Sequence, residues 1–383
     1  MYLTTKYPNP HYSPEVCSQV TLINFTTTET GLTDLLMNNL IEVEQEELDK
    51  MRIENMEKNA ENTKKLLETE NEILQIVSNV GSDILDDDTA INTLKSAQKT
   101  SSDIANQIEE SKKTEKLISD FRETYKSVAE RAALLYFCAS DFAVVDPMYQ
   151  FSLKWFVSLF KASISKAEHS ENTNELISNL NATVATSFFE SVSFSLFSRH
   201  KLLFSTLMAT RILTAEKEIT KSELAFLLSA DSNQIESNRP KNIEFISDDI
   251  WSLLLLLEKV SPSFENIVQN IQENQEDWKE YIESNEPETK CEIPLNKTVK
   301  LTSFQKLLIL RVFHLHRVRE GLRLFVSESL GTEFVTPPPL NLSNVFKNSS
   351  PLCPLIFIIT PGIDPVEEVT EVATSMELDK YLT

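Results

Sequence analysis

Glycine is the residue that most constrains this chain, because only five occur among its 383 residues: Gly31, Gly81, Gly321, Gly331 and Gly362. A loop that cradles phosphate needs clustered glycines, so that backbone N–H groups can approach the anion. No two of these glycines stand five positions apart, and a Walker-type loop, a dinucleotide fingerprint and a hydrolase elbow are all missing. The same scarcity favours long helices, whose interiors tolerate glycine poorly. The sequence therefore predicts a mainly helical fold without a nucleotide site.

The charge balance of the chain is acidic, with 58 acidic residues against 36 basic ones and a formal net charge of −22. Phosphate binding needs a basic surface, so this balance argues against a nucleic-acid partner and is typical of a solvated helical surface. Hydrophobic residues make up 41% of the chain, which is enough for packed cores, and the length predicts two or three domains.

The four cysteines, Cys17, Cys138, Cys291 and Cys353, form no C-x-x-C pair. This spacing argues against a zinc knuckle and fits reduced thiols in the cytosol. The N-terminus does not resemble a signal peptide, and no apolar run approaches the ~20 residues that span a bilayer. We therefore expect a soluble cytoplasmic protein without a membrane partner.

Two long helices are predicted between residues 32 and 125. Nothing breaks a helix from about residue 32 to 77, and a second helix is predicted from about 89 to 125. Together they predict an antiparallel coiled-coil hairpin with arms on the order of 50–65 Å long. The pattern alone favours a plain helical spacer over an arm whose register adjusts. The predicted seams are Ile53, Met56, Ala60, Thr63, Leu67, Glu70, Leu74 and Val77 in the first helix, and the more polar Ile91, Leu94, Gln98, Ser101, Ala105 and Ile108 in the second.

A globular helical core is predicted beyond residue 131, where aromatic and aliphatic residues become frequent. Asp146-Pro147 is expected to end one helix and start the next. Thr220 and Glu223 form a capping-box pattern. Further helices are predicted at 248–260, 264–284 and 301–330. Short β-prone runs lie at 2–5 and 20–26, and 355–359 has the composition of a buried strand.

No residue is predicted to be catalytic, cofactor-binding or metal-binding. The predicted strand–turn–helix at 355–376 occupies the place of a phosphate loop, but it lacks the Lys-Ser/Thr pair, and Pro361 and Pro365 remove two N–H donors. His314 and His316 are two apart on a predicted helix and cannot easily share a metal, so they are expected on the surface or in a groove. The remaining candidates are given structural interpretations: His11 as a loop residue, His200 at a helix end or in packing, Cys138 in the core, Trp155, Trp251 and Trp278 as packing anchors, and Asp86–Asp88 as a helix cap rather than a calcium loop.

Several segments together resemble dynein heavy chains, most closely those of the axonemal inner-arm type. Their order and spacing match the family across nearly the whole chain. The turn around His11 and the run at 147–153 are the specific signals, whereas the coiled coil alone is not one. The matching segments are YLTTKYPNPHYSPE at 2–15, VTLINF at 20–25, GLTDLL at 31–36, VAERA at 128–132, LYF at 135–137, PMYQFSL at 147–153 and LIFIITPGIDP at 355–365.

The resemblance implies an architecture and a role. Residues 1–31 would end the large subdomain of the fifth AAA+ module, 32–125 would be the strut or buttress hairpin, 126–300 would be the helical small subdomain and linker, and 301–383 would start the sixth module. This implies partial α/β AAA+ subdomains at both ends. ATP and Mg²⁺ would be used in other modules, and this fragment would be inactive alone.

The resemblance also implies partners and a mechanism. The partners would be the remaining heavy-chain modules and the stalk, and, through the whole motor, intermediate chains, light chains and microtubules in the cytoskeleton of the cilium or flagellum. Ring changes driven by ATP would act through the strut on the register of the stalk, and the polar seam positions Glu70, Gln98 and Ser101 are compatible with sliding.

The chain departs from the family at 315–318, where LHRV replaces the usual R-P-D-R/K. It also begins inside one subdomain and stops early in another, which we interpret as an incomplete gene model or a truncated product. The alternative interpretation is a free-standing helical scaffold protein that binds partners through its helix faces. The flanking coding sequence distinguishes the two, because a heavy chain continues on both sides.

Overall fold

The structure is a computed structural model that describes residues 3–5, 11–23, 26–79, 88–170, 172–229, 240, 243, 245–297, 299–336, 342–348, 355–359, 362 and 364–376. These residues are mainly helical, which confirms the predicted fold class at that level. The α-helices are α1 (Pro14–Gln19), α2 (Glu29–Glu44), α3 (Glu46–Asn79), α4 (Asp88–Asp141), α5 (Leu153–Lys166), α6 (Thr173–Ser193), α7 (Ser198–Ala215), α8 (Lys221–Ser229), α9 (Asp248–Val260), α10 (Ile267–Glu273), α11 (Gln275–Glu283), α12 (Pro287–Lys290), α13 (Ser303–Phe313), α14 (Val318–Ser329), α15 (Leu342–Asn348) and α16 (Val366–Ser375). Short 3-10 turns are η2 (Phe142–Val144), η4 (Pro262–Phe264), η5 (Pro294–Lys297), η6 (Leu315–Arg317) and η7 (Thr332–Phe334).

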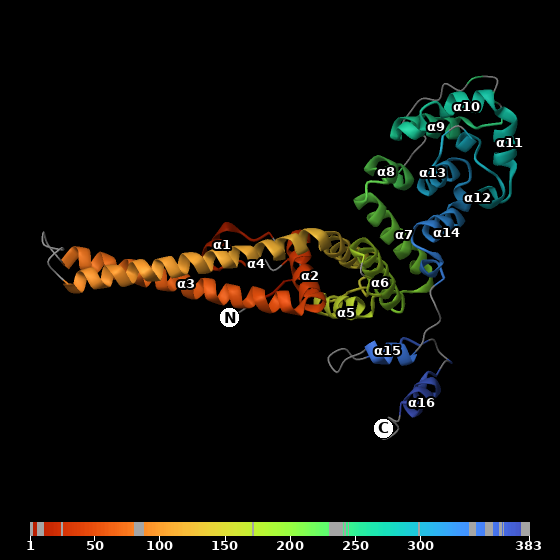
Figure 1. Ribbon diagram of the computed structural model, residues 1–383. Coiled ribbons are helices and arrows are strands. Elements are labelled where there is room, and N and C mark those ends of the chain that lie inside the picture. Colours follow the sequence, from red (N-terminus) through yellow and green to blue (C-terminus); the bar gives the residue numbers. More distant parts are fainter. Residues whose placement is uncertain are drawn as a thin grey trace. The chain divides into compact units, whose positions relative to one another are not determined.

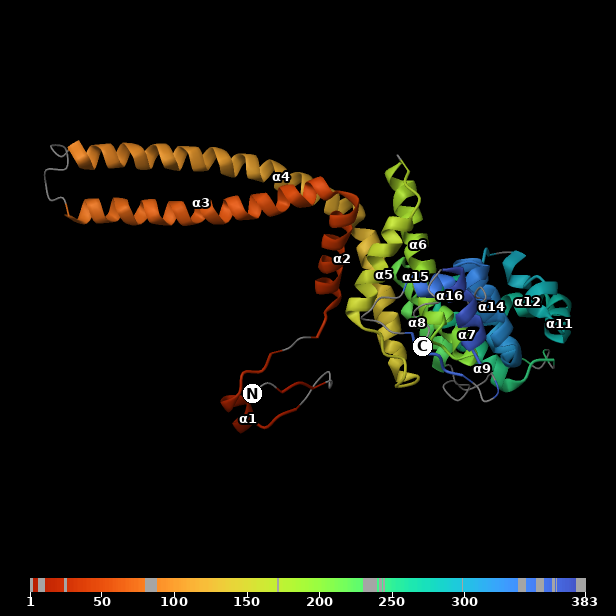
Figure 2. The ribbon, with the colours of Figure 1, turned by 90° about the horizontal axis from the view of Figure 1, so that it is seen from below.

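The chain divides into two compact units, residues 1–188 and 189–383. In the first unit, α3 and α4 lie side by side and run in opposite directions, away from α2 and α5 (Figures 1 and 2). The predicted Asp86–Asp88 cap lies almost wholly outside the described residues, since only Asp88, the first residue of α4, is described.

The single helix predicted from residue 32 to 77 is wrong, because the chain leaves the helical conformation at Gln45. Its φ of −138° and ψ of 66° separate α2 from α3, and its N–H donates to the carbonyl of Ile41. Figure 2 shows α2 turned sharply away from the direction of α3. Tertiary packing explains the break: α2 packs its apolar face against α4 and α5, whereas α3 packs along α4. The buried residues of α2 are Leu32, Leu36, Met37, Leu40 and Ile41.

The second long helix extends further than predicted, since α4 continues from Asp88 to Asp141 without interruption. Its C-terminal part enters the helical core of the first unit and buries Val128, Ala132, Leu135 and Cys138. The core position predicted for Cys138 is therefore confirmed. A helix holds together over such a length when one face finds tertiary partners along it, because propensity alone contributes little.

The prediction that Pro147 starts a helix is wrong. Pro147 lies in a turn, in which the Asp146 carboxylate accepts from the N–H of Met148. The next helix, α5, begins at Leu153, where the Ser152 hydroxyl accepts from the N–H of Trp155. A serine whose side chain satisfies a free N–H of the first turn is a stronger start than a proline without such a cap.

Residues 189–383 contain the helices that pack around Trp251, Trp278, Phe304 and Phe325. Helix α9 has the predicted bounds 248–260, and Thr220 and Glu223 form the predicted capping box. The helices predicted at 264–284 and 301–330 are both interrupted. The first breaks at Asn274, and the second at His314, where φ is −133° and ψ is 64°.

The predicted strands are not formed in the described part of the chain. Residues 355–359 have no ladder partner, and their side chains are 41–83% exposed. The described residues of the runs at 2–5 and 20–26 likewise lack strand structure. A β-strand exists only when its N–H and C=O groups pair with a second extended segment, so composition alone cannot make one. Thr360, Pro361 and Ile363 of the turn at 360–365 lie outside the described residues.

Candidate functional site at the base of the long helices

Helix α2 packs against both long helices, α3 and α4, and against α5. The Thr28 side chain caps its start by accepting from the N–H of Gly31. The apolar face of α2 is buried, and its polar side chains at the edge of that face reach the three neighbouring helices.

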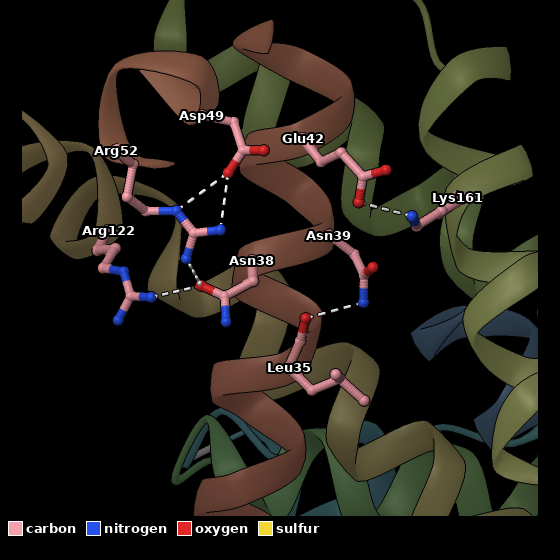
Figure 3. Close-up of polar contacts among 8 residues, drawn as sticks. All are labelled: Leu35, Asn38, Asn39, Glu42, Asp49, Arg52, Arg122 and Lys161. Carbon is pink, nitrogen blue, oxygen red and sulfur yellow. Dashed lines mark hydrogen bonds and ion pairs between the residues drawn. The ribbon is translucent and has the colours of Figure 1, made fainter. Parts of the chain in front are cut away.

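Asn38 of α2 is the centre of the polar contacts at this junction (Figure 3). Its Oδ1 accepts from Nη1 of Arg52 on α3 at 3.2 Å and from Nη2 of Arg122 on α4 at 2.5 Å. A carbonyl oxygen has two lone pairs, so the one amide oxygen of Asn38 can accept from both guanidinium groups. The three helices are therefore held at one atom.

Asp49 orients the first of these arginines. Its Oδ1 accepts from Nε of Arg52 at 3.0 Å and lies 2.8 Å from Nη2, and both side chains are mostly buried (Figure 3). A carboxylate that accepts two N–H groups fixes the plane of a guanidinium, so the third nitrogen points toward Asn38. We call Asn38, Asp49, Arg52 and Arg122 the α2 node.

A second contact joins α2 to α5. Nζ of Lys161 donates to Oε2 of Glu42 at 2.7 Å, at the edge of the helix packing (Figure 3). The Glu42 side chain is 54% exposed, so solvent screens this pair and its contribution is below about 1 kcal/mol. The apolar face of α2, rather than this ion pair, holds α2 on α5.

The face of α3 that packs against α4 is polar. Asn62 is buried, and Nδ2 of Asn59 donates to Oγ of Ser111 across the two helices at 3.0 Å. Nδ2 of Asn55 is buried and has no hydrogen-bond partner among the described residues. The half-buried and buried residues recur at spacings of three and four: Arg52, Asn55, Asn59, Asn62, Leu66, Thr69 and Ile73.

The predicted seam of α3 is therefore wrong by one residue. Ile53, Met56, Leu67 and Leu74 are 47%, 65%, 58% and 64% exposed, and Glu70 is exposed as well. Each residue turns a helix by about 100°, so the apolar stripe lies on a different face of α3 from the residues that pack against α4. The node explains this choice, because it holds Arg52 toward α2 and α4. We call Ile53, Met56, Leu67 and Leu74 the outer stripe.

The predicted seam of α4 is partly right. Ile108 is half-buried, whereas Gln98 and Ser101 are exposed. The buried residues that continue this face are Ile104, Ser111 and Ile118. The side chains of its remaining predicted positions, Ile91, Leu94 and Ala105, lie outside the described part, as does that of Val77 in the predicted seam of α3.

Other residues singled out in the sequence take structural positions. Trp251 and Trp278 are buried, and Trp155 lies 5.4 Å from Phe151 between ring centroids, which confirms three packing anchors. His200 lies in the first turn of α7 against Phe197, as predicted for a helix end. His11 is exposed in a loop.

The prediction that both His314 and His316 lie on the surface or in a groove is wrong for His314, which is buried, whereas His316 is exposed. Their ring centroids lie 5.7 Å apart. Nε2 of His314 lies 3.3 Å from the carbonyl oxygen of Tyr281. Burial lowers the pKa of His314, while the carbonyl of Tyr281 acts in the opposite direction. Among the described residues, no group of three histidine, cysteine, aspartate or glutamate side chains could hold a metal ion. None of the described helices is long and apolar enough to cross a membrane.

Sequence reasoning missed the α2 node. Arg122 lies 84 residues from Asn38, and no local pattern pairs them. A weak signal existed, because Asn38 directly follows the buried Met37 on an apolar helix. A polar residue at the border of an apolar face has to find partners once the face is buried.

Comparison with known proteins matches the whole chain to one group. Residues 1–104 match the family described as the ATP-binding dynein motor region. The chain is 35% identical over 383 residues to dynein axonemal heavy chain 1 of Homo sapiens, covering 100% of this chain and 9% of that protein. It is 33% identical over 376 residues to the dynein-1-beta heavy chain of the flagellar inner arm I1 complex of Chlamydomonas reinhardtii, covering 98% of this chain and 8% of that protein. The ciliary dynein beta chain of Heliocidaris crassispina is 33% identical over 369 residues, covering 96% of this chain and 8% of that protein. The chain thus spans less than a tenth of the length of these relatives.

Proposed function

Because this chain belongs to the family of axonemal dynein heavy chains, we propose that it is a structural, nucleotide-free part of a microtubule motor of the axoneme. In this proposal the α3–α4 pair is the coiled-coil strut that couples ATP-driven changes of the motor ring to the stalk. Identity of 35% across all 383 residues supports a motor fragment over a free-standing scaffold protein.

We also propose how the chain divides among the modules of the motor. Residues 1–31 end the fifth AAA+ module, 32–125 form the strut, 126–300 form the small subdomain and linker, and 301–383 start the sixth module. ATP and Mg²⁺ act in other modules of the whole heavy chain. Intermediate chains, light chains and microtubules are partners of the whole motor in the ciliary cytoskeleton, and this fragment alone has no ATPase activity.

The observation that carries the proposal is the presence of two different faces on α3. The polar face packs against α4, and the outer stripe remains exposed. Ile53 and Met56 are three residues apart, Leu67 and Leu74 are seven apart, and Ala60 and Thr63 continue the repeat between them. Apolar side chains at heptad spacing on an exposed helix face fit a partner helix. The proposal assigns this face to the stalk.

The polar face and the node give the strut its mechanical properties. Asparagine and serine side chains across α3 and α4 contribute less to a fixed register than apolar knobs do. The α2 node, by contrast, joins the base of both helices to α2. The base is therefore held firmly, and register can adjust further along the pair. Glu70, Gln98 and Ser101 do not contribute to this behaviour, because they face solvent.

Substitution of the outer stripe in a complete motor tests the proposal. Leu67→Gln with Leu74→Gln removes the apolar face without adding charge, and Glu61→Gln with Glu68→Gln is the matched control on an exposed face turned away from both α4 and the stripe. The stripe variant is expected to lose the coupling between nucleotide state and microtubule affinity, while the control keeps it. Normal coupling in the stripe variant, with the protein folded, would rule the proposal out.

A further inference from the structure

The hydrogen bonding between α3 and α4 is uneven along α3. Asn55, Asn59 and Asn62 lie on the face of α3 that packs against α4, at spacings of four and three residues. Opposite them on α4, the buried Ser111 accepts from Nδ2 of Asn59 at 3.0 Å. Nδ2 of Asn55, one turn nearer to α2, is buried without a partner among the described residues. One hydroxyl oxygen therefore has two amide donors within about one helical turn of it.

A slide of α3 by four residues would exchange these two donors. Four residues advance by about 6 Å along a helix and turn it by about 40°, so the same face of α3 stays against α4. Asn55 would then take the place of Asn59 opposite Ser111, and one amide–hydroxyl hydrogen bond would replace another. The exchange therefore keeps the number of these hydrogen bonds unchanged.

The corner between α2 and α3 leaves one direction open for such a slide. Helix α2 packs against α3 at this end, so movement of α3 toward α2 is blocked. Movement away from α2 only lengthens the corner at Gln45, which is exposed and already outside the helical conformation. An extended residue spans about 3.3 Å and a helical residue about 1.5 Å, so unwinding three or four residues beside Gln45 supplies about 6 Å.

The α2 node holds the present register. Arg52 of α3 and Arg122 of α4 bind the same oxygen of Asn38, which fixes the position of the two helices along each other. Asp49 keeps the Arg52 side chain in its orientation. A displacement of about 6 Å is far larger than the variation in length of a hydrogen bond, so the bond between Arg52 and Asn38 has to break before α3 moves.

We propose that the α3–α4 pair has two registers. In the present register the node is closed and Ser111 accepts from Asn59. In the second register the node is open, α3 has moved about 6 Å away from α2, and Ser111 accepts from Asn55. This inference rests on the strut function proposed above and names a discrete movement within the strut. The pair converts opening of the node into a displacement of fixed length, because only one other amide reaches the hydroxyl.

Pairs of cysteines in the full 383-residue chain distinguish the registers, because a disulfide forms only where two Cα atoms come within about 7 Å. The pairs lie one heptad further from α2 than the contact at Ser111 and leave that contact intact. Leu66→Cys with Ile104→Cys reports the present register, and Asn62→Cys with Ile104→Cys reports the second one. Thr69→Cys with Ile104→Cys reports a slide of similar length in the opposite direction. Mass spectrometry of peptides identifies each disulfide in the presence of the native cysteines.

The first pair should form its disulfide while the node is intact. Asn38→Ala is expected to raise the rate for the second pair several-fold, and Asn55→Leu in addition is expected to reverse that rise, whereas the third pair stays slow in every background. Arg122→Gln removes one of the two donors of the node and takes the place of Asn38→Ala if circular dichroism shows that variant to be unfolded.

Three results would overturn the proposal. They are equal rates for the second and third pairs, no rise for the second pair when the node is removed, and a rise that Asn55→Leu leaves unchanged. The outer stripe is the same in all these variants, and the outer-stripe variants keep the node. Failure of the two-register proposal is therefore distinguishable from failure of the strut function.

Discussion

Asn59 on α3 and Ser111 on α4 face each other across the two long helices, with Nδ2 of Asn59 donating to Oγ of Ser111 at 3.0 Å. Two helices that meet through an amide and a hydroxyl are held differently from helices that meet through leucines. Their contact depends partly on hydrogen-bond geometry, whereas Ile53, Met56, Leu67 and Leu74 of α3 remain exposed on its outer stripe. The stability of this interface is therefore open to direct test.

Replacing Asn55 by leucine is expected to stabilise the α3–α4 pair. Nδ2 of Asn55 is buried without a partner among the described residues, and removing such a group recovers a desolvation cost of about 1–3 kcal/mol. The free energy of unfolding, measured by urea denaturation, should rise by about 1 kcal/mol or more. Asn59→Leu is the control. Because it breaks the hydrogen bond to Ser111, its free energy of unfolding should rise less than that of Asn55→Leu. A loss of stability in Asn55→Leu would contradict the assignment.

Replacing Asn38 by alanine is expected to destabilise the first unit by about 2 kcal/mol. Two guanidinium groups lose their shared acceptor, and hydrogen bonds to charged groups contribute about 1.5–3 kcal/mol. The adjacent Asn39 is a matched control, since its amide donates only to the carbonyl of Leu35 within α2. Asn39→Ala should change stability by no more than about 0.5 kcal/mol. Equal effects of the two substitutions in thermal unfolding would show that the node does not join the helices.

His314 is expected to make the second unit less stable as the pH falls. Burial lowers its pKa in the folded state below the ordinary value of 6.5, so the unfolded chain binds the proton more readily. Above pH 6.5 the ring is mostly neutral in both the folded and the unfolded chain, so its titration does not change the stability. The stability falls as the pH decreases from 6.5 toward the pKa of the folded state. His314→Gln should remove this part of the pH dependence, measured by chemical denaturation between about pH 7.5 and 5.5. An identical profile for His314→Gln and the unmodified chain would exclude the effect.

Replacing Gly321 by alanine is expected to cost the second unit about 1–3 kcal/mol. A Cβ at this position would lie 2.4 Å from Cδ2 of Leu310 and 2.9 Å from Cδ1 of Leu307, so both leucines must move. They line a cavity beside Glu288 and can shift into it, which places the cost near the lower end of that range. Thermal unfolding measures the cost. An unchanged unfolding temperature of the variant would show that the two leucines move without cost.

Local signals in the sequence predicted some features of the helices. Helix α9 has the bounds 248–260 that were predicted for it, and Thr220 with Glu223 forms the predicted capping box at the start of α8. These features depend on residues within one or two turns of each other. Gln45 carries no such signal, because it is a good helix former that leaves the helix when α2 and α3 pack against different partners.

The candidate site could not be predicted for the same reason. The α2 node joins residues that lie 14 and 84 positions apart in the sequence. The run at 355–359 has the composition of a strand but no extended partner within the described residues. Pairing is a property of two segments, and one sequence pattern describes only one of them.

The sequence by itself determined that the chain is mainly helical, that it lacks a glycine-rich phosphate loop, and that α3 has an apolar stripe at heptad spacing. Helix periodicity decides which side chains share a face, since each residue advances by about 100°. The tertiary structure alone decided which face is buried. The node at Asn38 directs Arg52 toward α2 and α4, so the asparagines of α3 meet α4 and the outer stripe faces solvent.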